Sequence, residues 1–269
     1  MAARAIEAMI PYPRPETLDP EVKPAFGRFP IIGEKVRIED LRGQEDKLSL
    51  DREGFVLLRW PSKVKNFRDP EEVRRVYVPE IEAMLREVTG ASKVTTDGPG
   101  LVRLSRRSEE SKKVGVGTGN FVHADYSMNA GPTWLNRALP EAEAKQRLKK
   151  RYGIYNIWRA YSEPPQDVPL AVCDARTVTQ AEIIHCDLTI GRPGGEGFTF
   201  ENSAYLYNPR HRWCYFSNMT RDDVLIFRGL ESSHNWTSAV PHTAFEDPTC
   251  PEDAPARESI DIRSVVYYD

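Results

Sequence analysis

The stretch Phe121-Val122-His123-Ala124-Asp125-Tyr126-Ser127 is the part of the chain from which the rest can be interpreted. Its pattern is typical of the end of a β-strand. Side chains on a strand alternate between the two faces, so His123 and Asp125 point the same way, with Cα atoms roughly 6.5–7 Å apart. An imidazole and a carboxylate placed in this way can both bind one metal ion, at about 2.0–2.2 Å from each. Because a lone His-x-Asp is common by chance, the downstream sequence has to supply the remaining ligand.

The third ligand is predicted to be His242, one of five histidines in the chain. It lies in the segment Ala239–Phe245, between two predicted strands near the C-terminus. Two histidines and one carboxylate on one face of a metal ion leave positions free for substrate and oxygen. This arrangement is typical of non-haem Fe(II) oxygenases.

An arginine follows at the start of the last predicted strand, in Arg257-Glu258-Ser259. Arg257 and Ser259 share a face of that strand. A guanidinium beside a hydroxyl suits the capture of a carboxylate through two hydrogen bonds. Arg176 and Arg263 are alternative anion-binding groups, and Arg263 lies further along the same face as Arg257.

A second His-x-Asp, His185-Cys186-Asp187, competes with the first. It lies closer in sequence to His242, but too few predicted strands separate the two for a sheet-sandwich site. We therefore interpret His185 as an ordinary strand or loop residue. His211 and His234 flank aromatic residues and are predicted to be structural or surface groups.

Composition narrows the class of protein. The chain has 269 residues, of which 40% are hydrophobic and 10% aromatic, enough for a substantial core. A net charge of −3 and a pI of about 6.0 give no reason to expect nucleic acid or an anionic membrane as partner. No apolar run is long enough to cross a bilayer, and the N-terminus lacks a secretory signal, so we expect a cytoplasmic protein. The four scattered cysteines are expected to be free thiols.

Many short strands separated by turns predict a mainly β protein with flanking helices, built as a double-stranded β-helix of the jelly-roll, cupin-like type. Helices are predicted from Asp69 to Gly90 and from Pro140 to Lys150. The predicted strands are Lys35–Asp40, Gly54–Trp60, Tyr152–Ala160, Leu170–Arg176, Phe198–Tyr207, Arg212–Phe216, Val224–Phe227 and Ile260–Tyr268.

We expect one domain over residues 1–269 with three parts. Residues 1–30 are rich in proline, which removes backbone donors, and are predicted to form an extended arm. Residues 31–120 are predicted to be an α/β support that ends in a polar, glycine-containing loop over residues 103–120, a candidate lid. The GVGTG within this loop is not a phosphate-binding loop, because it lacks the following Lys-Ser/Thr. Residues 121–269 are predicted to form the jelly-roll catalytic core.

Taken together, these residues resemble the Fe(II)/2-oxoglutarate dioxygenase superfamily. Over about residues 31–268 the chain resembles, more narrowly, the AsaB-type hydroxylase/desaturase family of fungal natural-product pathways. The segments that carry this resemblance are Gly54–Trp60, Val122–Ser127, Tyr155–Tyr161, Pro169–Thr177, Tyr207–Phe227, Pro241–Pro248 and Arg257–Arg263. Each segment is weak alone, but the set is specific.

The resemblance implies that His123, Asp125 and His242 are the Fe(II) ligands and the catalytic centre. It also implies that Arg257 and Ser259 hold the distal carboxylate of 2-oxoglutarate. The family commonly has glutamine after the His-x-Asp, whereas this chain has Tyr126. That departure adjoins the metal and bears on how the substrate is oriented.

The activity implied is oxidation of an unactivated C–H of a small secondary metabolite or amino-acid-derived substrate. It would proceed by hydroxylation, desaturation or oxidative cyclisation, with 2-oxoglutarate and O₂ converted to succinate and CO₂ beside the product. Asn156 is a candidate contact for 2-oxoglutarate. Candidate substrate contacts are Tyr126, Trp158, Arg159 and Tyr207.

Two other functions fit the same residues. One is a cupin-like metalloenzyme that does not use 2-oxoglutarate. The other is a non-catalytic jelly-roll binding protein whose histidines are structural. The expected partner is a small-molecule substrate, and the sequence carries no information on oligomeric state.

Overall fold

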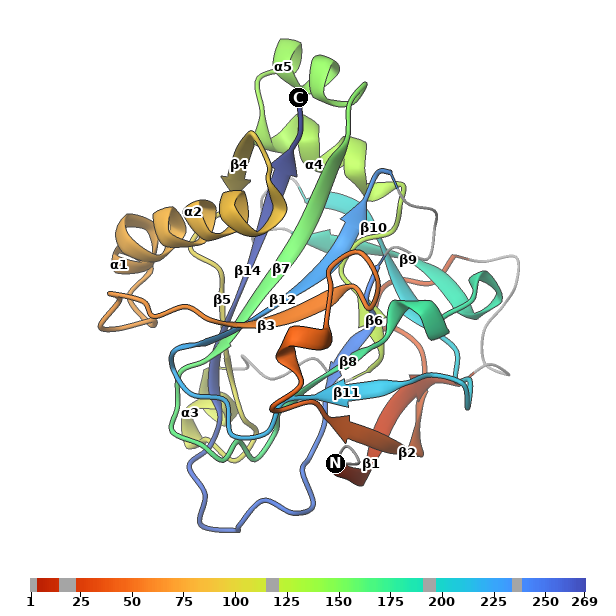
Figure 1. The fold of residues 1–269 in the computed structure, drawn as a ribbon. Helices are drawn as coiled ribbons and strands as arrows, with labels where there is room; N and C mark the ends of the chain where they lie inside the picture. The colour runs from red at the N-terminus through yellow and green to blue at the C-terminus, as the bar shows by residue number, and fades with distance from the viewer. Residues whose placement is uncertain (1–3, 15–22, 115–120, 191–196, 234–238) are drawn as a thin grey trace.

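The computed structural model describes residues 4–14, 23–114, 121–190, 197–233 and 239–269 (Figure 1). Within these residues, the strands form two sheets, which confirms the mainly β, jelly-roll prediction. The larger sheet has eight strands in the order β1-β2-β11-β8-β13-β6-β10-β9. The smaller has the order β3-β12-β7-β14-β4, and β5 pairs with β14 beside β4.

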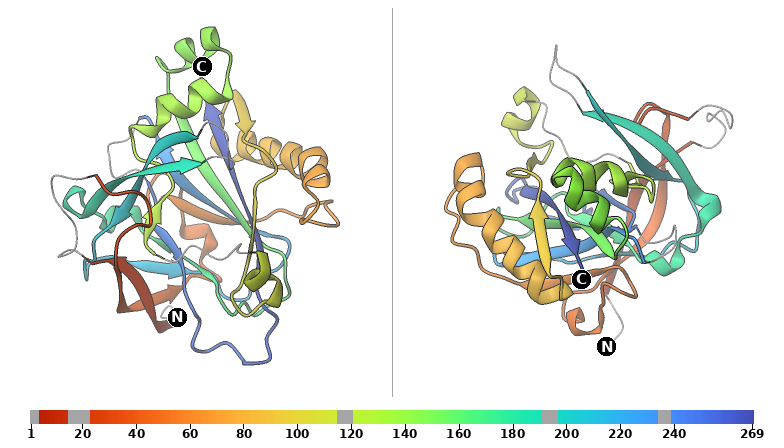
Figure 2. Two further views of the ribbon diagram at one scale, coloured as in Figure 1. Left: turned by 180° about the vertical axis from the view of Figure 1, so that it is seen from behind. Right: turned by 90° about the horizontal axis from the view of Figure 1, so that it is seen from above.

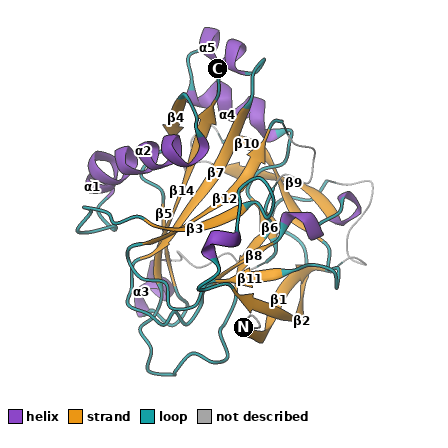
Figure 3. Ribbon diagram, in the orientation of Figure 1, coloured by secondary structure: helices purple, strands orange, loops and turns teal. Residues whose placement is uncertain are grey.

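The strands of the larger sheet are β1 (Arg4–Pro13), β2 (Ile31–Asp40), β6 (His123–Ala124), β8 (Leu170–Cys173), β9 (Ile183–Ile190), β10 (Phe198–Tyr205), β11 (Trp213–Tyr215) and β13 (His242–Ala244). Those of the smaller sheet are β3 (Phe55–Arg59), β4 (Lys93–Thr96), β5 (Leu101–Leu104), β7 (Tyr152–Ala160), β12 (Asp223–Glu231) and β14 (Glu258–Tyr267). The helices are α1 (Pro70–Glu72), α2 (Val78–Thr89), α3 (Glu109–Val114), α4 (Ala130–Ala138) and α5 (Glu141–Arg147). Figure 3 shows the helices at the periphery of a body made of strands.

The predicted helix from Asp69 to Gly90 is confirmed. Asp69 caps its start by accepting a hydrogen bond from the backbone of Glu71, and Gly90 ends it in a left-handed conformation with φ of 69°. One turn of π-helix, Val73–Tyr77, joins α1 to α2. The buried face of α2 carries Ile81, Met84 and Leu85, which pack on the outer face of the smaller sheet. The helix and the β9–β10 pair lie on opposite sides of the molecule (Figures 1 and 2).

Residues 4–13 are extended, but they form a regular strand where the proline content predicted an arm without regular structure. They form β1, which pairs antiparallel with all ten residues of β2. Strand β1 is at the end of the eight-stranded order, where Pro11 and Pro13 are tolerated because an edge strand does not need every backbone donor. Residues 31–120 likewise contribute β2 to the larger sheet and β3, β4 and β5 to the smaller one. They are part of the same two sheets as the strands after residue 121.

The predicted lid loop is more regular than expected. It begins within β5 and includes α3, while residues 115–120, with their three glycines, lie outside the described residues. Movement of this segment stays a prediction. Among the helices of the described residues, none is both long and apolar enough to span a membrane.

Strands from both sheets approach each other around the His-x-Asp segment. Strand β6 lies between β13 and β10 in the larger sheet. Strands β7 and β14, central in the smaller sheet, pair along nine residues. Asn156 and Arg263 are partners in that register, and so are Trp158 and Asp261. The fold thereby places polar residues of the smaller sheet opposite the histidines of the larger one.

Candidate metal centre

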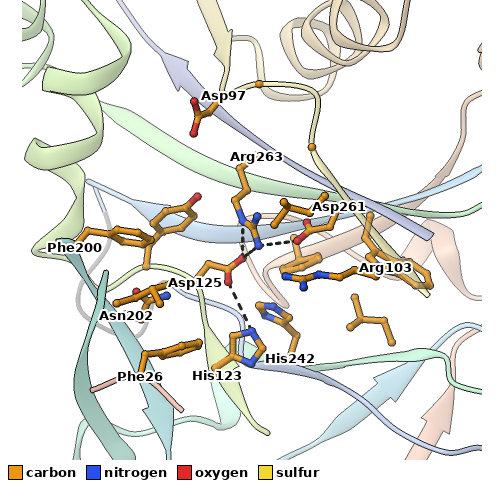
Figure 4. A pocket seen from close by; sticks show the side chains of 18 of the residues that line it. Phe26, Asp97, Arg103, His123, Asp125, Phe200, Asn202, His242, Asp261 and Arg263 are labelled. Atoms are coloured by element: carbon orange, nitrogen blue, oxygen red, sulfur yellow. Dashed lines mark hydrogen bonds and ion pairs between the residues drawn. The ribbon is translucent and has the colours of Figure 1, made fainter. Parts of the chain in front are cut away.

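His123, Asp125 and His242 come together although His242 is far from the other two in sequence. His123 opens β6, and His242 opens β13 directly opposite it in the antiparallel register. Their ring centroids are 4.4 Å apart, and Nε2 of His123 is 3.7 Å from Oδ1 of Asp125. One ligand atom from each residue lies within 4.8 Å of the others (Figure 4). The three side chains can therefore bind a single ion.

Hydrogen bonds orient both imidazoles for metal binding. Nδ1 of His123 is 2.7 Å from the carbonyl oxygen of Phe121, and Nδ1 of His242 is 3.2 Å from that of Val240. A ring that donates from Nδ1 presents an unprotonated Nε2 to a metal. Burial and the neighbouring His242 lower the pKa of His123 to about 4, and burial also lowers the pKa of His242. Both rings are thus neutral at pH 7.

Asp125 is held from behind by Arg263 and Asn156. Arg263 donates from Nε to Oδ2 of Asp125 at 2.8 Å, and its Nη2 lies 2.7 Å from the same oxygen. Nδ2 of Asn156 also donates to this oxygen, at 2.5 Å. Burial alone would raise the pKa of Asp125, but Arg263 and the two histidines hold it well below its ordinary value. Since Oδ2 is occupied, Oδ1 remains available as a single-oxygen metal ligand.

Asp261 extends this network and was not predicted from sequence. Its Oδ2 accepts a hydrogen bond from Nη2 of Arg263 at 2.7 Å. Burial raises the pKa of Asp261 to about 6, against the opposing effect of Arg263. Asp125 and Asp261 raise the pKa of Arg263 although burial opposes them. The signal was present in the sequence, because Arg257, Ser259, Asp261 and Arg263 alternate along one strand.

The rival motif does not form a metal site. His185 lies on β9, its side chain is 50% exposed, and its Nδ1 is 3.1 Å from Glu201. His211 is structural, as predicted: its ring lies between the hydroxyl of Tyr12 and the carboxylate of Glu182. His234 lies outside the described residues. Within the described part of the chain, His123, Asp125 and His242 are the one group of three with suitable ligand spacing.

A cavity of about 890 Å³ surrounds the three ligands. Aromatic residues line one end, and Figure 4 shows Phe26, Phe200 and Asn202 on that side of Asp125. Arg103 and Asp261 lie on the other side of Asp125 in the same view. The centre is thus flanked by an apolar end and a polar end.

Arg257 belongs to the polar end. Its side chain is buried, lines the cavity and lies with its guanidinium carbon 5.6 Å from the centre of the Trp158 ring. Among the described residues, its Nε has no hydrogen-bond partner. Burial lowers the pKa of Arg257 to about 10, so the group is charged at neutral pH. A buried, charged donor without a partner fits a bound carboxylate.

The two other predicted co-substrate residues are less exposed to the cavity. Ser259 is buried behind its wall, and its hydroxyl donates to the carbonyl of Arg103 at 3.3 Å. Asn156 is also outside the lining and uses its amide nitrogen to hold Asp125. Contact of either side chain with 2-oxoglutarate stays a prediction.

Tyr126 and Trp158 line the cavity, in positions where a substrate can reach them. Arg159 and Tyr207 require correction. Arg159 points to the opposite face of β7, where its three nitrogens donate to the hydroxyl of Tyr77 and to the backbone carbonyls of Trp60 and Arg221. Tyr207 is 38% exposed and packs edge-to-face on Tyr12 outside the cavity.

Sequence reasoning missed Asn202, Trp134 and Phe200, which line the aromatic end. Phe200 and Asn202 share a face of β10, but β10 is linked to β6 only through the register that pairs Ala204 with His123. That pairing joins distant segments and leaves no mark in the local sequence. Trp134 lies on α4, a helix that we did not predict.

The residues present fit Fe(II) and 2-oxoglutarate. Two neutral imidazole nitrogens and one carboxylate oxygen form a three-ligand face that suits Fe(II) and leaves other positions open. The partnerless Nε of Arg257 offers a second anchor in the same cavity.

Comparison with known proteins points to the same class of enzyme. A family model described as Oxidoreductase/YMDC permease-like domain matches residues 19–267. The chain is 32% identical over 250 residues to hydroxylase/desaturase CTB9 of Cercospora beticola, covering 87% of this chain and 76% of that protein. It is 30% identical over 240 residues to the Fe(II)/2-oxoglutarate-dependent dioxygenase nvfI of Aspergillus novofumigatus, covering 87% and 83%. A solved structure of the iron and alpha-ketoglutarate-dependent endoperoxidase NvfI superposes with a TM-score of 0.85 at 26% identity, covering 99% of each chain.

Proposed function

Because this chain belongs to the oxidoreductase family matched over residues 19–267 and, within it, to the fungal Fe(II)/2-oxoglutarate-dependent hydroxylases and desaturases, we infer that His123, Asp125 and His242 hold its iron. The protein is an oxidoreductase that uses Fe(II), 2-oxoglutarate and O₂. The observation that supports the ligand assignment most strongly is the convergence of the three side chains around one point. The comparisons give no support to the two alternative functions, a metalloenzyme that does not use 2-oxoglutarate and a non-catalytic binding protein.

In this proposal, Arg257 anchors the distal carboxylate of 2-oxoglutarate. Its burial strengthens a charge-assisted hydrogen bond, because little water competes for the guanidinium. Trp158 packs against the guanidinium and fixes its direction. Ser259 adds a weaker contact from the neighbouring position on the strand.

When bound, Fe(II), 2-oxoglutarate and O₂ supply the oxidation of an unactivated C–H bond, with succinate and CO₂ as co-products. The chain's residues set the conditions for that chemistry. Arg263 keeps Asp125 ionised, and its hydrogen bond and that of Asn156 hold the carboxylate in place. The backbone carbonyls of Phe121 and Val240 fix the two rings. The aromatic end excludes water and orients the substrate so that one C–H faces the metal.

The proposed substrate is a small secondary metabolite, and the outcome is hydroxylation, desaturation or oxidative ring closure. The relatives' names carry the same range, since they include hydroxylase/desaturase CTB9 and the endoperoxidase NvfI. The cavity, at about 890 Å³, has room for a drug-sized molecule beside the co-substrate.

Succinate release tests this proposal. Purified protein incubated with Fe(II), ascorbate, O₂ and 2-oxoglutarate should form succinate slowly even without substrate. His123→Ala should abolish that turnover together with metal binding. His185→Ala, a matched change in the rival motif, should leave both unchanged, because that side chain is half exposed on β9 and away from the other two ligands. Loss of turnover in His185→Ala with retention in His123→Ala would overturn the ligand assignment.

A further inference from the structure

Buried polar atoms without partners gather at the aromatic end of the cavity. Among the described residues, no hydrogen-bond partner exists for the hydroxyl of Tyr126, for Nε1 of Trp134, or for either amide atom of Asn202. All three side chains line the cavity and are 1%, 5% and 1% exposed, respectively. Leaving a buried polar group unsatisfied costs about 1–3 kcal/mol. Polar atoms that remain unsatisfied within the protein and border an open cavity are therefore positioned for a ligand.

Aromatic packing fixes where these atoms lie. The Trp134 ring is edge-on to Tyr126 at 5.3 Å and to Phe200 at 5.2 Å between centroids. Phe198, Phe200 and Asn202 follow one another on the same face of β10. Asn202 thus projects from a wall that is otherwise apolar (Figure 4).

The charged groups near this end are already paired. Glu201 is on the opposite face of β10 and pairs with Lys23 at 2.5 Å. Arg137, which lines the cavity, lies 4.8 Å over the ring of Phe198 and 3.9 Å from Asp97. Arg257 is among the polar residues assigned above to 2-oxoglutarate. The aromatic end therefore favours a neutral ligand over an anion.

We propose that the aromatic end binds a neutral, ring-containing substrate through a carbonyl or hydroxyl oxygen, with Asn202 as the residue that recognises this oxygen. Nδ2 of Asn202 donates to it, and Nε1 of Trp134 and the hydroxyl of Tyr126 are the further polar contacts of the same end. This inference rests on the proposed function, because it takes the opposite end to be the 2-oxoglutarate site. Anchoring an oxygen on Asn202 sets which C–H of the substrate lies closest to the metal.

A matched pair of probes tests the proposal. Fluorenone and fluorene have the same ring system and differ in a carbonyl against a methylene. Their binding to full-length protein loaded with Mn²⁺ and 2-oxoglutarate is measured by equilibrium dialysis. One hydrogen bond to a buried donor is worth about tenfold in affinity, so fluorenone should bind about tenfold more tightly than fluorene. Fluorene-9-carboxylate, the anionic probe, should bind more weakly than fluorenone.

Asn202→Leu should remove the preference for fluorenone while binding of fluorene is kept. Tyr126→Phe, which deletes only a hydroxyl, should reduce the preference for fluorenone in part. It provides a second test if Asn202→Leu fails to fold. Tyr205→Phe is the control, because it removes a hydroxyl from the same strand in a part of the core outside the cavity. It should leave the preference at its wild-type value.

Equal binding of the two neutral probes to wild-type protein would overturn the proposal, as would a preference that survives Asn202→Leu. Tighter binding of the carboxylate would show that the end selects anions instead. These outcomes differ from failure of the proposed function, which would appear as absence of Mn²⁺ binding or of succinate release before any probe is added.

Discussion

Arg263 contacts Oδ2 of Asp125 with two of its nitrogens, at 2.8 Å from Nε and 2.7 Å from Nη2. The two groups come from different sheets. Asp125 directly follows β6 of the larger sheet, and Arg263 lies on β14 of the smaller one. A buried ion pair of this kind costs desolvation of both charges, so its presence at the proposed metal ligand indicates a functional constraint. It keeps the ligand ionised and leaves Oδ1 free.

Replacing Arg263 should weaken metal binding and make it depend on pH. In Arg263→Gln, burial is no longer opposed by the guanidinium, so the pKa of Asp125 rises from its depressed position. Only the deprotonated carboxylate binds metal, so the affinity of the variant should fall more steeply with decreasing pH than that of the wild type. We expect a loss of about 10–100-fold in Mn²⁺ affinity, measured by competition with a fluorescent chelator. Arg59→Gln, which alters an exposed arginine on β3, is the control. Wild-type affinity in Arg263→Gln at pH 6 would rule out this role.

Arg257 and Ser259 should contribute unequally to binding 2-oxoglutarate. Arg257→Gln removes charge-assisted hydrogen bonds worth about 1.5–3 kcal/mol each, so the KM for 2-oxoglutarate should rise about 100-fold. Ser259→Ala should raise it only about fivefold, because the carbonyl of Arg103 competes for the Ser259 hydroxyl and leaves a contribution of about 1 kcal/mol. Succinate release at varied 2-oxoglutarate concentration measures both. Arg176→Gln is the control, since Arg176 pairs with Asp174 outside the cavity. An unchanged KM in Arg257→Gln would assign the anchor to another arginine.

The sequence indicated the fold, the three side chains that converge in the cavity and the arginine that lines it, because these are carried by patterns local to single strands. His-x-Asp and Arg-x-Ser place pairs of side chains on one face by alternation alone. The residues that support the ligands were harder to predict, since each depends on pairing between distant strands. Arg263 reaches Asp125 through the packing of two sheets, and Arg159 was assigned to the substrate although alternation placed it on the opposite face from Trp158.

The N-terminal segment shows a second limit of local patterns. Pro11 and Pro13 argued against regular structure, yet both lie in β1. Proline is tolerated there because β1 lies at the edge of the sheet. That position can be seen only from the order of the strands in the sheet. Local proline content therefore predicted an extended chain correctly but not its place in the sheet.

Gly229 should be essential for the packing behind the metal ligand. A Cβ at this position would lie 2.8 Å from Oδ1 of Asn156 and 2.8 Å from the Tyr126 ring. Gly229→Ala should therefore displace Asn156 from Asp125 and lower Mn²⁺ affinity about tenfold. Gly33→Ala is the matched control, because its new Cβ would approach only the flexible side chain of Met9. Equal metal affinity in the two variants would show that the site tolerates the displacement.

Asp174 should make a pH-dependent contribution to stability, away from the metal. Burial alone would raise its pKa, but hydrogen bonds from Arg176 and Arg212 hold the pKa below the ordinary value. A carboxylate with a depressed folded-state pKa stabilises the fold above about pH 4, and this contribution is lost as pH falls through the folded-state value.

Asp174→Asn should accordingly lower the free energy of unfolding by about 1–3 kcal/mol at pH 7. The difference from wild type should shrink as the pH falls below about 4. Urea denaturation at several pH values measures it. Asp222→Asn, which alters the partner of the exposed Arg59, should have little effect on the free energy of unfolding at any of these pH values. A difference that grows with acidity would contradict this assignment.

The most direct test of the central claim is a crystal structure of the protein grown without oxygen in the presence of Mn²⁺ and 2-oxoglutarate. We predict one ion bound by Nε2 of His123, Oδ1 of Asp125 and Nε2 of His242, with the distal carboxylate of 2-oxoglutarate on the guanidinium of Arg257. An ion bound at His185, or a 2-oxoglutarate whose distal carboxylate lies away from Arg257, would contradict it.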